Sequence, residues 1–109
     1  MDVANHSQYW QVEYESLRSQ FDELTKLSKI FVQIKEERQR QDFKWGEQNH
    51  TPEWWMNILM EEVGEASKAL LEANVGAWSL SKYCKQYRKE VVQIAAVAVA
   101  MLECFDRNK

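Results

Sequence analysis

The feature that most constrains the fold is the run VVQIAAVAVAML at residues 91–102, which is apolar at eleven of its twelve positions. A helix that is apolar on every side must be surrounded by other protein or by lipid. The run is too short to cross a bilayer, and its length and its alanines favour a central bundle helix over a buried strand. A chain of 109 residues has few other helices to cover it. We therefore predict a homodimer or homotetramer with this helix at or near the interface.

The rest of the chain contains few turn-forming residues, with three glycines and one proline in all. This scarcity argues against a turn-rich β fold, so we expect an all-α helical bundle. Apolar residues recur at alternating spacings of four and three from Trp10 to Ile34, which predicts a helix over about residues 8–44. Such a helix would be about 55 Å long, so we expect a bend around Thr25–Ser28. Gly46 suits the position just after the end of this helix.

Thr51 and Pro52 mark the start of a second helix. Threonine is a good N-cap residue, and proline is favoured at the first helical position. This helix should end near residues 74–76, and Ser79 or Ser81 can cap a third helix that contains the apolar run. We see no linker or repeat, so residues 1–109 are expected to be one domain, with residues 1–29 as an N-terminal helical extension of its core.

Charge and cysteine usage narrow the functional classes. A net charge of −3 gives no basic field for duplex nucleic acid, so no nucleic-acid polymer is expected as a partner. Cys84 and Cys104 lie twenty positions apart on one expected helix, about 30 Å, too far for a disulfide. They indicate free thiols in a reducing compartment. The N-terminal MDVANHSQYW has neither the apolar core of a signal peptide nor a lipidation motif. We therefore expect a cytoplasmic protein with no membrane attachment.

The segment NILMEEVGEASKALLE, residues 57–72, places three glutamates beside the apolar face of the second helix. On a helical projection Glu61, Glu65 and Glu62 fall at about 0°, 40° and 100°. Ile58 and Ala69 fall inside the same arc at about 60° and 80°. Close carboxylates repel one another and their burial is costly, so ordinary core formation does not explain this pattern. A divalent cation would remove both objections.

Glu90 and Gln93 begin the apolar helix one turn apart on the same face. If the second and third helices pack antiparallel, these two residues can face Glu61, Glu62 and Glu65. Four carboxylates and one amide would then surround a small space. Hard oxygen ligands of this kind suit Mg²⁺, with Mn²⁺ as a substitute, rather than Zn²⁺, which prefers histidine and cysteine.

These motifs resemble those of a known family. EEVGE, followed after twenty-four residues by ExxQ, resembles the EExxE…ExxD motif of the MazG-like all-α nucleoside triphosphate pyrophosphohydrolases. The preceding RQRQDFKWGEQNHTPEWW is also similar to the segment that leads into that motif, so that the resemblance covers roughly residues 30–105. It implies a MazG-like helical bundle completed by homo-oligomerisation. It also implies Mg²⁺-dependent hydrolysis of a ribo- or deoxyribonucleoside triphosphate to a nucleoside monophosphate and pyrophosphate.

The resemblance also implies roles for individual residues. Its metal ligands would be Glu61, Glu62, Glu65 and Glu90. Glu61 or Glu62 would in addition orient or deprotonate the attacking water. Gln93 stands where the family motif has aspartate, and its amide oxygen can bind magnesium but brings no charge. Glutamates alone would repel a triphosphate, so the ion must bridge the two sets of oxygens.

Substrate recognition needs a flat apolar surface with a few polar groups. Trp45 offers the surface, in a region that stacks the base in related enzymes, and Arg38 and Gln41 lie near it on the same helix stripe. The candidates for phosphate contacts are His50, Lys85, Arg88 and Lys89. Each has a simpler explanation: Trp45 in core packing, His50 beside the N-cap, and the others as exposed residues or surface ion pairs.

A second class of function remains open. The chain could be a non-catalytic helical interaction module with a degenerate metal site, using the apolar stripe of its N-terminal helix to bind a partner. Gln93 supports this alternative, because a lost acidic ligand can mean a lost activity. The presence of all four glutamates argues against it.

Overall fold

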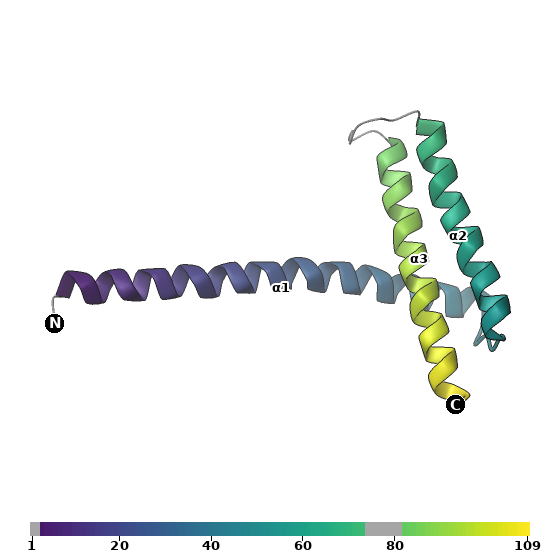
Figure 1. The fold of residues 1–109 in the computed structure, drawn as a ribbon, viewed down its shortest axis with the longest axis horizontal. Helices are drawn as coiled ribbons and strands as arrows, with labels where there is room; N and C mark the ends of the chain where they lie inside the picture. The colour runs from purple at the N-terminus through teal and green to yellow at the C-terminus, as the bar shows by residue number, and fades with distance from the viewer. Residues whose placement is uncertain (1–2, 74–81) are drawn as a thin grey trace. The chain divides into compact units, whose positions relative to one another are not determined.

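The computed structural model describes the backbone of residues 3–73 and 82–109, and the side chains of residues 8–72 and 85–109. This part of the chain contains three α-helices and no strand: α1 (Val3–Trp45), α2 (Pro52–Ala73) and α3 (Lys82–Arg107) (Figure 1). The expected all-α class is therefore confirmed. The chain divides into two compact units, Met1–Val32 and Gln33–Lys109, and α1 contributes to both.

The first unit is a single stretch of α1. Every side chain from residue 8 to residue 32 is exposed, including its aromatic and aliphatic ones. The helix is continuous through Thr25–Ser28, where the sequence suggested a bend. There the Thr25 hydroxyl donates a hydrogen bond of 2.9 Å to the Phe21 carbonyl, an arrangement that a helix tolerates. Helix α1 is thus longer than expected and uninterrupted at this point.

The ends of α1 and α2 follow the local signals in the sequence. Gly46 has a φ of 73°, which glycine adopts without steric cost, and its N–H donates to the Asp42 carbonyl at 2.8 Å. Pro52 is the first residue of α2. The Thr51 hydroxyl accepts a hydrogen bond of 3.3 Å from the N–H of Trp54, so Thr51 is the N-cap. Helix α2 ends at Ala73, and the proposed caps at Ser79 and Ser81 lie outside the described residues.

Helices α2 and α3 pack side by side and antiparallel (Figure 1). Their shared core contains Trp55, Val97, Ala100 and Cys104, with Ile58, Leu59 and Met101 packed against it. Small residues are also buried on both helices, Ala66 and Ala69 on α2 and Ala96 on α3. The core sits on one face of each helix.

The described part of the chain covers only one side of helix α3. Ala96 is completely buried, whereas Val91, Val99 and Leu102 are 40%, 36% and 66% exposed. The apolar run thus retains an uncovered surface, and the homo-oligomer inferred from it stays a prediction. Among the described helices, none combines the length and the apolar character needed to cross a membrane.

Candidate functional site

Two acids and an amide meet where α2 and α3 face each other. In the amide orientation that satisfies its neighbours, Gln93 of α3 donates from its nitrogen to Glu62 Oε2 at 3.1 Å and to Glu90 Oε2 at 2.8 Å. Glu90 is only 8% exposed, and its second oxygen accepts a hydrogen bond of 2.6 Å from Gln86. The antiparallel packing therefore brings Glu62, Glu90 and Gln93 together as the sequence indicated.

The charge of Glu62 is disfavoured in this setting. Partial burial raises the pKa of its carboxyl, and the nearby acid Glu90 raises it further. Glu65, Glu37 and Glu61 add smaller contributions of the same sign. Glu61 and Glu65 are themselves exposed, so the acid cluster opens toward solvent from the buried Glu90. Crowded carboxylates of this kind would be relieved by a cation.

The donors of this cluster fit a hard cation in type. Glu62, Glu90 and Gln93 supply carboxylate and amide oxygens, the ligands that Mg²⁺ and Mn²⁺ prefer. Among the described residues, no three side chains of histidine, cysteine, aspartate or glutamate converge closely enough to hold a metal ion. In this arrangement the Gln93 amide lies between the two acids, and its N–H groups stabilise both carboxylates by hydrogen bonding.

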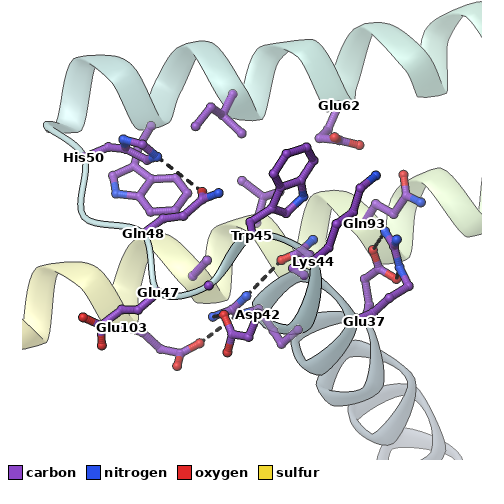
Figure 2. Close-up of a pocket in the computed structure, with 18 of the residues that line it drawn as sticks. Glu37, Asp42, Lys44, Trp45, Glu47, Gln48, His50, Glu62, Gln93 and Glu103 are labelled. Atoms are coloured by element: carbon purple, nitrogen blue, oxygen red, sulfur yellow. Dashed lines mark hydrogen bonds and ion pairs between the residues drawn. The ribbon is translucent and has the colours of Figure 1, made fainter.

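A cavity of about 600 Å³ adjoins the acid cluster within the unit Gln33–Lys109. Its walls come from the end of α1, the connection to α2, the first half of α2, and α3 (Figure 2). Seven residues singled out from the sequence line it: Arg38, Gln41, Trp45, His50, Glu61, Glu62 and Gln93. Residues from four parts of the chain, α1, its connection to α2, α2 and α3, thus line one cavity.

Five residues singled out from the sequence do not line this cavity: Glu65, Glu90, Lys85, Arg88 and Lys89. Glu90 still touches its rim through the hydrogen bond to Gln93. The three basic residues are exposed near the start of α3. Lys89 is close enough to α1 to contribute to lowering the pKa of Glu37, which lies in the cavity wall.

Arg38 is engaged by neighbouring side chains. Its guanidinium donates to Glu103 Oε1 of α3 at 2.8 Å, to Gln41 Oε1 at 3.0 Å and to Asp42 Oδ1 at 3.0 Å. Burial opposes the charge of Arg38, but the carboxylates of Glu103 and Asp42 outweigh it and raise the pKa of the guanidinium. Arg38 therefore fastens the end of α1 to α3, and Gln41 turns its oxygen toward it.

Aromatic side chains form another part of the wall. Trp45 is 61% exposed, and the Lys44 ammonium lies 4.8 Å from the centre of its ring. In Figure 2 both side chains extend from the end of α1 into the cavity that Glu62 also lines. The His50 ring meets Trp55 edge to face at 4.9 Å, with Trp54 at 6.3 Å. This wall offers an exposed flat surface beside a lysine.

The connection between α1 and α2, which carries His50, is held by the end of α3. Arg107 donates to the Gln48 carbonyl at 3.1 Å and pairs with Glu47 at 3.3 Å, and Asn108 donates to Asn49 at 2.8 Å. The thiol of Cys104 lies underneath and is a free, buried cysteine. The Trp55 indole N–H has no hydrogen-bond partner of good geometry. It lies near enough to Cys104 to lower the pKa of the thiol, whereas burial raises that pKa.

Several cavity residues escaped the sequence analysis. Glu37 and Arg40 form a close pair in the wall, with Arg40 donating at 2.6 and 2.8 Å, and this pairing lowers the pKa of Glu37. A spacing of three on a helix could have indicated that pair. The other lining residues, which the sequence analysis did not assign to a site, are Asp42, Lys44, Gly46, Glu47, Gln48, Trp54, Trp55, Ile58, Val97, Ala100, Glu103 and Arg107. No local pattern in the sequence indicates that Glu103 and Arg107 of α3 lie in the cavity wall. The side chain of Cys84 lies outside the described residues.

Comparison with known proteins gave no match: no protein-family model, no curated protein and no solved structure corresponds to this chain. The function must therefore be argued from the site itself and from its motifs.

Proposed function

We propose that this chain is a Mg²⁺-dependent nucleoside triphosphate pyrophosphohydrolase, which can also use Mn²⁺. It hydrolyses a ribo- or deoxyribonucleoside triphosphate between the α and β phosphates and releases a nucleoside monophosphate and pyrophosphate. The observation that carries the proposal is one cavity lined by both Glu61 and Glu62 and the exposed indole of Trp45. At about 600 Å³ its volume is in the range of small-molecule sites. Acids and a flat aromatic surface are what a metal-bound triphosphate and its base require.

The ion would be held by Glu61, Glu62, Glu65, Glu90 and Gln93, all of which have oxygen donors. Their side chains would have to draw closer together around it, since no three of the described acids converge on one point in this structure. The raised pKa of Glu62 supports this assignment, because a dication favours the charged acids that their mutual repulsion disfavours. When bound, magnesium would neutralise phosphate charge and lower the pKa of a water molecule. An amide at position 93 leaves the set with one negative charge fewer than the family motif, so we expect weak binding of the ion in the absence of nucleotide.

The residues of the chain then have distinct tasks. Glu61 or Glu62 accepts the proton of the attacking water or holds that water in place. The Lys44 ammonium, already within the cavity, balances phosphate charge, and Arg40 lies in the same wall. Trp45 provides the face on which a base stacks.

Arg38 is a positioning residue under this proposal. Its three hydrogen bonds fasten α1 to α3 and orient Gln41 in the cavity wall. His50 packs against Trp55 and supports the aromatic wall. Assigning Lys85, Arg88 and Lys89 to phosphate contacts finds no support in the cavity lining.

The rival is a non-catalytic helical interaction module, and one observation favours it. The Gln93 amide satisfies both Glu62 and Glu90 by hydrogen bonding, so these acids can coexist without an ion. An enzyme releases pyrophosphate when magnesium and a nucleotide are added together, whereas a non-catalytic module does not.

The deciding experiment pairs two variants that make the same chemical change on one helix. Glu62→Gln removes a carboxylate from the cavity, and Glu72→Gln removes an exposed one beyond it. Pyrophosphate release from a panel of nucleotides is measured with and without magnesium, and folding is checked by circular dichroism. We expect release by the wild type and by Glu72→Gln with magnesium only, and a loss of about 10²-fold or more in Glu62→Gln. Equal rates in both folded variants, or no release by the wild type, would favour the module.

A further inference from the structure

The N-terminal unit exposes an apolar stripe along one face of α1. Six of its residues follow the alternating four-three spacing and are 56–68% exposed: Trp10, Tyr14, Leu17, Phe21, Leu24 and Phe31. An amphipathic helix that leaves such a face in water gains little stability from packing, since helix propensity alone contributes weakly. A contiguous apolar stripe of this length on a helix is typical of a surface that binds another helix.

The spacing of the stripe is that of a heptad repeat. With the seven positions lettered a to g, Tyr14, Phe21 and Ser28 take position a. Trp10, Leu17, Leu24 and Phe31 take position d. A period of 3.5 residues keeps this seam facing one partner helix along its whole length, which is the geometry of a coiled coil.

The charges that flank the seam identify the partner and its direction. Within residues 7–32 the e and g positions carry only two charged residues, Glu13 at g and Arg18 at e, five positions apart. In a parallel, in-register pair, a g residue faces the e residue five positions later on the other helix. Glu13 of each chain would then face Arg18 of its copy. In an antiparallel pair g faces g and e faces e, so these two residues could not meet.

We propose that residues 10–31 of α1 pair with the same segment of a second copy of this chain as a parallel, in-register coiled coil. The partner is a second copy because the seam and its flanking charges are self-complementary. Each copy supplies both members of the Glu13–Arg18 pair. This inference is independent of the hydrolase activity, since the stripe lies in the unit Met1–Val32 and the cavity lies in Gln33–Lys109.

Engineered disulfides test the direction and register in the full-length chain. Ser28→Cys places a thiol at position a, where a parallel pair brings identical residues within bonding distance. Ser19→Cys places a thiol at the outward position f as a matched control. After equilibration in a glutathione redox buffer, a non-reducing gel should show a covalent dimer for Ser28→Cys. The Ser19→Cys variant and the wild type, with its native cysteines, should remain monomeric on the gel. Equal cross-linking of both variants, or none in either, would overturn the proposal.

A second pair of variants tests whether the seam holds the copies together. Leu17→Glu puts a charge into the seam, and Val12→Glu puts the same charge at an equally exposed apolar position on the opposite face, since the two side chains are 57% and 67% exposed. Light scattering at matched concentrations should give Leu17→Glu half the mass of the wild type and Val12→Glu the full mass. A wild type of 13.0 kDa, or equal masses for the two variants, would contradict the proposal.

Discussion

Residues 8–32 of α1 and the pair of helices α2 and α3 all carry apolar side chains suited to packing, but these side chains have different surroundings. In the first region every side chain is exposed, although it contains Trp10, Leu17 and Phe21. In the second region Trp55 and Val97 are each 5% exposed, and they join one core. Periodicity thus shows that a helix has a face to be covered. It does not show whether the same chain covers it.

The difference extends to polar groups. Within residues 8–32, polar side chains reach groups one helical turn away, as in the 2.9 Å hydrogen bonds from Gln11 to Glu15 and from Thr25 to the Phe21 carbonyl. In the unit Gln33–Lys109, by contrast, Arg38 and Glu103 are joined across sixty-five residues of sequence. The second unit should therefore hold its fold by itself, whereas the first should depend on what binds its stripe.

The largest effect should come from placing a charge in each region in turn. Val97→Asp would bury an unpaired carboxylate in the core between α2 and α3, with an expected loss of about 4 kcal/mol or more of the free energy of unfolding. Val12→Asp makes the same substitution at an exposed site of α1 and should cost much less. Thermal unfolding followed by circular dichroism gives both values. Similar losses in the two variants would show that the regions do not differ in the way described.

A smaller effect is expected at the aromatic wall of the cavity. Trp45→Ala removes the proposed stacking surface and should raise the KM for the nucleotide about tenfold, with little change in kcat. Phe43→Ala, at a 95% exposed position outside the cavity lining, and Phe21→Ala in the first region should leave KM near the wild-type value. Steady-state rates of pyrophosphate release provide the comparison. An unchanged KM in Trp45→Ala would remove Trp45 from the substrate site.

The smallest effect concerns the acid cluster. Gln93→Asp replaces the amide that donates to Glu62 and Glu90 with a third acid, so the Tm should fall by a few degrees without magnesium. Millimolar magnesium should then raise the Tm more than it does in the wild type, and less magnesium should be needed for half-maximal pyrophosphate release. Gln39→Asp, at an exposed position of α1 outside the cavity lining, adds the same charge as a control. If the two variants respond equally to magnesium, position 93 is not part of a metal site.

Local signals in the sequence predicted much of the fold because they act within a few residues. Thr51, Pro52 and Gly46 end or begin helices through their own side chains and backbone, so their roles were predictable. The meeting of Glu62 with Gln93 was also predictable, since it follows from antiparallel packing of two amphipathic helices.

The rest of the site depends on contacts between distant segments. Arg38 lines the cavity, and its guanidinium is held there by Glu103 of α3, but no local pattern links the two residues. Arg107 likewise reaches Glu47 from the other end of the cavity-forming unit. The sequence showed a group of charges near a helix start, at Lys85, Arg88 and Lys89. Only the packing of α3 decides whether these side chains face the cavity or the solvent.

The central claim is hydrolysis between the α and β phosphates at the cavity of the second unit. Phosphorus NMR of a nucleoside triphosphate incubated with the full-length chain and magnesium tests it directly, because the two products have separate signals. We predict that nucleoside monophosphate and pyrophosphate appear in equal amounts with the wild type, and that neither appears without magnesium or with Glu62→Gln. Release of orthophosphate in place of pyrophosphate, or an unchanged spectrum for every nucleotide tested, would contradict the account.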